Sequence, residues 1–178
     1  MRHAAFVRAV MVGRDGLHRQ VLLDCFSQAG AEAPRSYITT GNVTFTAPPD
    51  GVGAIRDRAE AAIEEVVGRR TEVYVRSVPY LQDLIAREPY RSSPVADAVE
   101  HEVMFLYEDI DPSELELPIV SSGGHIIVFG ATSTEVFAAG REIDGQRKGA
   151  GGWVQRLLGQ RVTARAWRTI ERVVADPV

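Results

Sequence analysis

The order of helix and strand patterns in the first 77 residues is the feature that most limits the fold of this chain. Apolar residues recur at helical spacing in two stretches, and four shorter stretches are aliphatic, β-branched or aromatic. In chain order we predict a strand over 4–12, a helix over 18–29, strands over 35–39 and 43–46, a helix over 54–67 and a strand over 71–76. This β-α-β-β-α-β order is that of a ferredoxin-like subdomain.

The second half repeats the pattern less completely. We predict strands over 102–107, 125–129, 135–139 and 162–165, and helices over 151–158 and 167–174. Where the first helix should stand, residues 111–115 form at most one helical turn. We therefore predict an α+β protein with two ferredoxin-like subdomains packed together, at 1–77 and 101–178, with a helical linker and loop over 78–100 and an extra C-terminal helix.

Composition excludes several classes of protein. Hydrophobic residues make up 45% and charged residues 25% of 178, a balance typical of a folded globular protein. No apolar run is long enough for a transmembrane helix, and Arg8 interrupts the apolar N-terminus, so we expect neither a membrane protein nor a signal peptide. Cys25 is the only cysteine, which fits the reducing cytoplasm. Four scattered histidines offer no ligand spacing, so we expect no metal and no cofactor.

Charge is distributed unevenly along the chain. Residues 90–135 carry nine acidic side chains against Arg91 alone, whereas residues 141–172 carry eight basic groups against three acids. The basic segment can attract a small anion, while the acidic middle and the net charge of −4 should repel a long polyanion. Nucleic-acid binding is therefore the least favoured of the functions considered.

The glycine-rich loop over 140–152 is the strongest candidate site. It contains Arg147 and Lys148 and runs into a predicted helix, whose first N–H groups are free to meet an anion. Lys148 is the only lysine beside nineteen arginines, which suggests a use for a compact ammonium group. The alternative is a solvated loop.

Other residues are weaker candidates for the same anion. Arg8 lies in a predicted apolar strand and needs either an internal ion pair or a ligand anion. Gly13 opens a loop between strand and helix that could hold a phosphate, although it matches no dinucleotide or P-loop motif. Arg165 could extend the basic patch. The last candidate is the hairpin tip, which we predict as a tight turn centred on Gly41 and Asn42 with Thr40 before it. These residues either contact the ligand or only form the turn.

Catalytic signatures are missing from the sequence. It contains no G-x-S-x-G elbow, no Ser-His-Asp grouping and no H-E-x-x-H motif. The predicted central strands also lack the paired aromatic residues with which ferredoxin-like sheets bind RNA.

Four segments of the sequence form an ordered set of motifs. They read Arg8-Ala9-Val10-Met11-Val12-Gly13-Arg14, Tyr37-Ile38-Thr39-Thr40-Gly41-Asn42-Val43-Thr44-Phe45, Gly145-Gln146-Arg147-Lys148-Gly149-Ala150 and Arg165-Ala166-Trp167-Arg168-Thr169. In the same order they resemble the patterns R-G-I-N-V-G-G, Y-I-x-S-G-N-V-x-F, G-R-S-K-L-T and R-N-W-x-T of the family called domain of unknown function 1697. The resemblance implies two ferredoxin-like halves and no established activity.

This chain departs from the family pattern at polar positions. Met11, Ala150 and Ala166 stand where the family has Asn, Thr and Asn, and Thr40 replaces a Ser. If the family has an active site there, this member has altered or lost it.

These observations favour a protein that binds a phosphate- or carboxylate-bearing ligand between its two halves. Arg8, Arg147, Lys148 and Arg165 would converge on the anion, with the Gly41-Asn42 turn nearby. The sequence leaves open whether a reaction follows. The alternative is a non-catalytic protein–protein interaction module or homodimer.

Overall fold

The computed structural model describes residues 1–175 and shows an α+β protein with two antiparallel sheets and a C-terminal helix. The chain divides into two compact units: Met1–Asp83 with the chain end from Val173, and Leu84–Arg172. Residues 176–178, included in the predicted second subdomain, lie outside the described residues. Within 1–175, no helix is both long enough and apolar enough to cross a bilayer.

The N-terminal unit is built on a four-stranded sheet. Its elements are β1 (Arg2–Val7), α1 (Arg19–Gln28), β2 (Glu32–Tyr37), β3 (Asn42–Thr46), the 3₁₀ turn η1 (Pro49–Gly51), α2 (Val52–Val67) and β4 (Val73–Ser77), followed by α3 (Val78–Ala86). The strand order is β2-β3-β1-β4, and each neighbouring pair is antiparallel.

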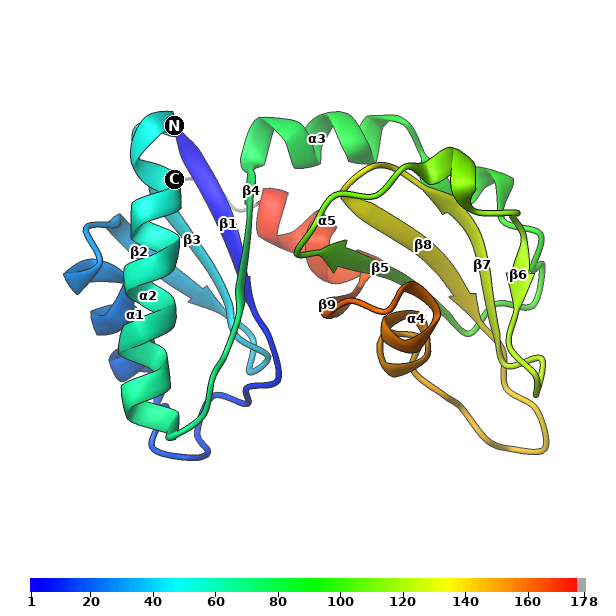
Figure 1. Cartoon of the computed structure of the whole chain (residues 1–178), viewed down its shortest axis with the longest axis horizontal. Coiled ribbons are helices and arrows are strands. Elements are labelled where there is room, and N and C mark those ends of the chain that lie inside the picture. Colours follow the sequence, from blue (N-terminus) through cyan, green and yellow to red (C-terminus); the bar gives the residue numbers. More distant parts are fainter. Residues whose placement is uncertain (176–178) are drawn as a thin grey trace. The chain divides into compact units, whose positions relative to one another are not determined.

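One face of this sheet carries the core of the unit. Successive residues of a strand point to opposite faces, so Ala5 and Val7 of β1 point to the same side. They pack with Leu22 and Phe26 of α1 and with Ile63 of α2, all of them buried. Figure 1 shows α1 and α2 together against this face.

Strand β1 is shorter than the predicted 4–12 strand. It ends at Val7, and Ala9 takes a φ of 54°, outside the extended region. Val10 and Val12 lie beyond the strand but still pack against the core of the unit. The apolar run therefore continues beyond the strand as a segment whose Val10 and Val12 are partly buried while Ala9 and Met11 are exposed, and the strand predicted over 8–12 was wrong.

The hairpin between β2 and β3 also differs from the prediction. The register pairs Tyr37 with Asn42, so the loop is 38–41 and Asn42 belongs to the strand. Ile38 and Gly41 both take positive φ, at 49° and 67°. The position of the predicted two-residue turn, centred on Gly41 and Asn42, was wrong, because Asn42 pairs with Tyr37 between β2 and β3.

The C-terminal unit has a five-stranded sheet. Its elements are η2 (Pro89–Ser92), β5 (Glu100–Leu106), η3 (Pro112–Glu114), β6 (Ile119–Val120), β7 (Ile126–Ala131), β8 (Glu135–Gly140), α4 (Gly151–Leu158), β9 (Val162–Ala166) and α5 (Trp167–Ala175). The order is β6-β7-β8-β5-β9, again antiparallel. In this order β5, β8, β7 and β9 take the places that β1, β3, β2 and β4 take in the first sheet.

The two faces of this sheet differ in character. Helix α4 covers one face, where Met104 and Leu106 of β5 pack with Val154. On the other face the ring of Tyr90 lies 4.5 Å from that of His101 and 5.0 Å from that of Trp167. Burial raises the pKa of Tyr90 and lowers that of His101, because it disfavours the charged form of each group in this aromatic cluster.

Candidate functional site

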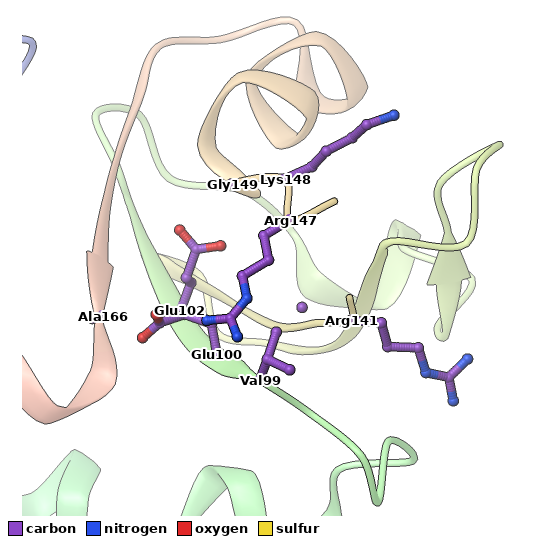
Figure 2. A pocket seen from close by; sticks show the side chains of 9 residues that line it. Val99, Glu100, Glu102, Arg141, Arg147, Lys148, Gly149 and Ala166 are labelled. Carbon is purple, nitrogen blue, oxygen red and sulfur yellow. The ribbon is translucent and has the colours of Figure 1, made fainter. Parts of the chain in front are cut away.

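Two cavities open beside Lys148 and Gly149, on the α4 side of the C-terminal unit. The first has a volume of about 230 Å³. Figure 2 shows side chains of its lining, which comprises Val99, Glu100, Glu102, Gly140, Arg141, Arg147, Lys148, Gly149 and Ala166. Because carboxylates and cations face it together, we call it the mixed cavity.

The second cavity, of about 240 Å³, contains no acidic side chain. It is lined by Ser121, Ser122, Gly123, His125, Ile126, Lys148, Gly149, Gly152, Trp153 and Arg156. Two cations and two hydroxyl groups therefore face it, and we call it the basic cavity. Lys148 and Gly149 line both cavities, so the two adjoin along this stretch of backbone.

The start of α4 already holds an anion that belongs to the protein. Glu102 lies on the α4 face of β5, and its Oε2 accepts a hydrogen bond of 2.8 Å from the N–H of Ala150. A carboxylate at this position stabilises the partial positive charge of the helix N-terminus. Glu102 thus takes the N–H of the N-cap residue Ala150, and the expectation that a ligand anion meets the first N–H groups of this helix stays a prediction.

Burial raises the pKa of Glu102, with a smaller contribution from the neighbouring Glu100 and an opposing one from the Ala150 hydrogen bond. A carboxyl group that faces a cavity with a raised pKa is a recognised signal of a functional site. Sequence reasoning missed it, since Glu102 was seen only as one of the acids of the middle segment.

Most other charged side chains of the mixed cavity have partners. Arg141 Nε lies 3.2 Å from Asp97 Oδ1, and Arg147 Nε donates to Glu142. Glu100 Oε2 lies 3.8 Å from Arg168 Nη2. Within residues 1–175, neither Lys148 nor Glu102 forms an ion pair.

His125 is the buried polar group of the basic cavity. Its residue is only 7% exposed, and Nδ1 has no hydrogen-bond partner in the described structure. A Cβ atom on Gly123 would lie 3.1 Å from its Cδ2 and 3.9 Å from the Nζ of Lys148. The imidazole ring and the ammonium group thus flank Gly123 together. The only hints in the sequence are the Gly123-Gly124 pair before a strand and the four-residue spacing of Gly152 and Arg156.

Comparison with known proteins places the chain in a family. A family model described as protein of unknown function (DUF1697) matches residues 1–123. The chain belongs to the DUF1697 family. The matched range ends before the glycine-rich loop and β9, so the cavities described above lie largely beyond it.

One solved structure with a similar fold is that of the conserved bacterial protein SP0830 from Streptococcus pneumoniae. The match has a TM-score of 0.67 at 18% identity and covers 97% of this chain and 96% of that chain. At this identity the likeness shows the fold alone. No curated protein matches the chain.

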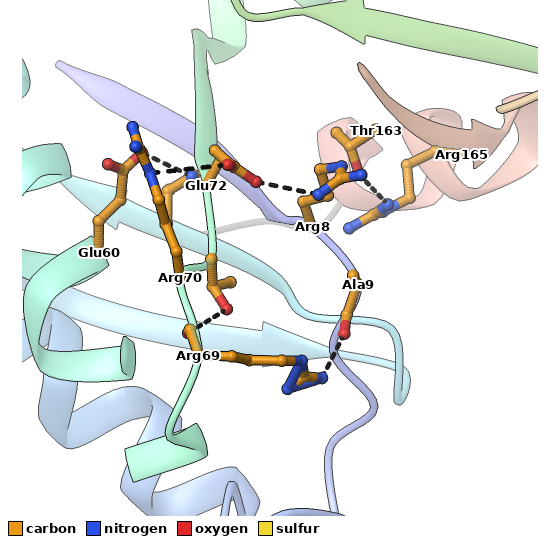
Figure 3. A network of polar contacts seen from close by, with 10 residues as sticks. Arg8, Ala9, Glu60, Arg69, Arg70, Glu72, Thr163 and Arg165 are labelled. Carbon is orange, nitrogen blue, oxygen red and sulfur yellow. Dashed lines mark hydrogen bonds and ion pairs between the residues drawn. The ribbon is translucent and has the colours of Figure 1, made fainter. Parts of the chain in front are cut away.

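The first DUF1697 segment forms structural contacts in the N-terminal unit. Arg8 Nη1 lies 3.2 Å from Oε2 of Glu72, whose side chain is only 2% exposed. Figure 3 shows the two side chains pointing toward each other. Arg8 therefore makes the internal ion pair that the sequence left open as an alternative. Gly13 has a φ of 98°, and its N–H donates to Leu17 in a tight loop.

The second DUF1697 segment shapes the β2–β3 loop. The buried Asn42 donates from Nδ2 to the carbonyl of Tyr37 and to Thr40 Oγ1, at 3.2 and 3.0 Å. The carbonyl of Gly41 accepts from the N–H of Val7 at 2.8 Å. These contacts correspond to the turn-chemistry alternative for Thr40, Gly41 and Asn42.

Arg165 lies on the other face of the five-stranded sheet from both cavities. Its neighbours Ala164 and Ala166 point to the α4 face, where a Cβ on Gly151 would lie 3.0 Å from Ala164 and where Ala166 lines the mixed cavity. Arg165 is 8% exposed and donates to Thr163 Oγ1 and to the carbonyl of Ala164. Of the predicted ligand-binding residues, the structure thus brings Arg147 and Lys148 to one cavity, while Arg165 lies across the sheet and the other five belong to the N-terminal unit.

Among residues 1–175, no group of three or more His, Cys, Asp or Glu side chains is placed to hold a metal ion.

Proposed function

We propose that the C-terminal unit binds a small phosphate- or carboxylate-bearing ligand in the basic cavity. The observation that carries this proposal is the composition of the lining: Lys148 and Arg156 face the cavity, no acidic side chain does, and the buried His125 leaves Nδ1 without a partner. A buried polar atom without a partner costs free energy unless something binds to it.

The chemistry of these groups suits an anion. An ammonium group offers three N–H donors and a guanidinium group five, and both form short, charge-assisted hydrogen bonds with oxyanions. Ser121 and Ser122 add hydroxyl donors at the same cavity. If a reaction follows binding, Lys148 is the group suited to stabilise a negative charge that develops on the ligand.

The sequence predicts an anion site between the two halves, whereas this proposal limits the site to the basic cavity of the C-terminal unit. It keeps Lys148 at the centre and replaces Arg8 and Arg165 by Arg156 and His125. It also assigns Arg147 to the neighbouring mixed cavity, where Glu142 already pairs with it.

We also infer a ferredoxin-like arrangement for each unit. The support is the shared strand order, β2-β3-β1-β4 in one sheet and β7-β8-β5-β9 in the other. The second unit would be a variant, with η3 and β6 between β5 and β7 in place of a helix.

Calorimetric titration and thermal melting with inorganic phosphate and with acetate test the binding proposal. A ligand that binds only the folded protein raises its melting temperature. Loss of one charge-assisted contact in Lys148→Met should weaken phosphate binding about tenfold. Arg172→Gln, which removes an exposed cation outside the cavity, is the matched control and should bind like the wild type. If neither anion binds, or if both variants bind equally well, the proposal is wrong.

A further inference from the structure

On either side of Gly149 lie two side chains of opposite charge that form no ion pair with any residue of the range 1–175. Lys148 and Gly149 line both cavities, whereas Glu102 lines the mixed cavity and not the basic one. Lys148 and Glu102 do not pair with each other. Figure 2 shows the Lys148 side chain extending away from Glu102.

The remaining charges of the mixed cavity are balanced locally. Asp97 balances Arg141, Glu142 balances Arg147, and Arg168 balances Glu100. The Glu102 carboxylate receives one hydrogen bond, from Ala150, and its other oxygen, Oε1, lies 3.8 Å from the position of a Cβ on Gly149. Lys148 also lines this cavity, but its side chain extends away from Glu102, so the charge left for a ligand beside Glu102 is negative.

A carboxylate that is partly removed from water and lacks a cation is costly to keep ionised. The raised pKa of Glu102 reflects this cost. A cationic group from a ligand would restore the balance, as an opposite charge within about 4–6 Å favours the charged form.

We infer that the ligand of the basic cavity also carries a protonated amine, which binds at Glu102 in the mixed cavity while its phosphate or carboxylate binds at Lys148. The ligand class is thus a small zwitterion, such as an amino acid or a phosphorylated amine. This inference rests on the proposed function, because the anionic group is what the basic cavity would hold.

Two pairs of probe molecules distinguish the contribution of the amine to binding from that of the anion. O-phosphoethanolamine and ethyl phosphate share a phosphate, and β-alanine and propionate share a carboxylate; only the first member of each pair has an ammonium group. Titration calorimetry on the wild-type protein should show at least one ammonium-bearing probe binding about tenfold more tightly than its partner, the effect of one charge-assisted contact. The better pair identifies the anionic group.

Glu102→Gln is the decisive variant. Its amide oxygen can still accept the hydrogen bond from Ala150, so the helix start is kept while the charge is removed. This variant should lose the preference for the ammonium-bearing probe and bind the amine-free probe as the wild type does. A purely structural role for Glu102 would move both affinities together. Glu116→Gln is the matched control, since that carboxylate is exposed in the same unit and lines neither cavity, and it should retain the preference.

The outcomes distinguish this inference from the proposed function. Equal affinities within both probe pairs, or an unchanged preference in Glu102→Gln, would overturn the zwitterion while anion binding stands. Failure of all four probes and of inorganic phosphate to bind would overturn both. Circular dichroism and thermal melting establish that each variant is folded.

Discussion

The two units share a strand order and differ in how they use their charged residues. In the N-terminal unit the buried carboxylate of Glu72 is paired with Arg8, and the amide of Asn42 is hydrogen-bonded within its own loop. In the C-terminal unit Lys148 and Glu102 have no ion-pair partner among the described residues, and His125 Nδ1 has no hydrogen bond.

The helices explain part of this difference. Helices α1 and α2 both cover the first sheet, and their side chains fill its core. In the second unit the connection from β5 to β7 carries the short η3 and β6, and α4 is the helix that packs on the sheet face bearing Met104 and Leu106. Ile110, Leu117 and Ile119 of this connection pack against the same core, in place of a helix. The comparison shows that Arg8 and Asn42 of the first unit have partners inside the protein, and the binding proposal therefore concerns the second unit.

The largest effect that would test this contrast is expected at Gly41. A Cβ there would lie 2.6 Å from Val10 Cγ2 and 3.0 Å from Val7 Cβ, and the φ of 67° is unfavourable for other residues. Overpacking and the left-handed conformation together should cost about 3 kcal/mol in Gly41→Ala. Urea denaturation measures this loss. Gly13→Ala is the control, because nothing lies within 4 Å of its Cβ position, and it should lose about 1 kcal/mol from backbone strain alone.

A smaller loss is expected when the Arg8–Glu72 ion pair is broken. Arg8→Met leaves the Glu72 carboxylate buried without its close partner, and the free energy of unfolding should fall by about 2 kcal/mol. Phosphate affinity in titration calorimetry should stay at the wild-type value. A loss of phosphate binding in this folded variant would contradict the assignment of stability to the first unit and binding to the second.

Glu102 should make the second unit sensitive to pH. Its pKa is raised in the folded state, so its contribution to stability is full below the ordinary value near 4.5 and is lost as pH rises through the folded value. Because glutamine does not ionise, Glu102→Gln does not lose stability in this way and should melt at a higher temperature than the wild type at pH 7. The gap should close toward pH 4. A wild-type advantage at pH 7 would show that the hydrogen bond from Ala150 and the helix N-terminus outweigh the cost of burying the carboxylate, and would contradict this prediction.

The smallest effect is expected at Lys148. Its side chain is exposed and forms no ion pair within the described structure, so Lys148→Met should change the free energy of unfolding by less than about 0.5 kcal/mol. Denaturant titration measures this. A larger loss would mean that the lysine has a structural role and that the binding proposal has lost its central residue.

Local patterns predicted much of the fold. The helix predicted over 151–158 matches α4. Its apolar residues recur at helical spacing, and this pattern is visible within a short stretch of the sequence. The two-residue strand β6 was not predicted, since Ile119 and Val120 are too few to form a pattern and pair only because β7 is beside them.

The candidate site was predicted only at Lys148 and Arg147. The rest depends on long-range pairing: Glu102 reaches the start of α4 across 48 residues of sequence, and the side of the sheet that Arg165 faces follows from the packing of α4. No pattern within a short window contains this information. The apolar residues Val10 and Val12 show the same limit, as burial alone does not distinguish a strand from a packed turn.

The hydrogen bond from Ala150 to Glu102 gives the molecule a natural reporter. A ligand amine that binds to the same carboxylate would change the strength of that hydrogen bond. It would thereby change the rate at which the Ala150 amide proton exchanges with solvent. Its resonance in an NMR spectrum would then register occupancy of the mixed cavity directly, without an assay for any reaction.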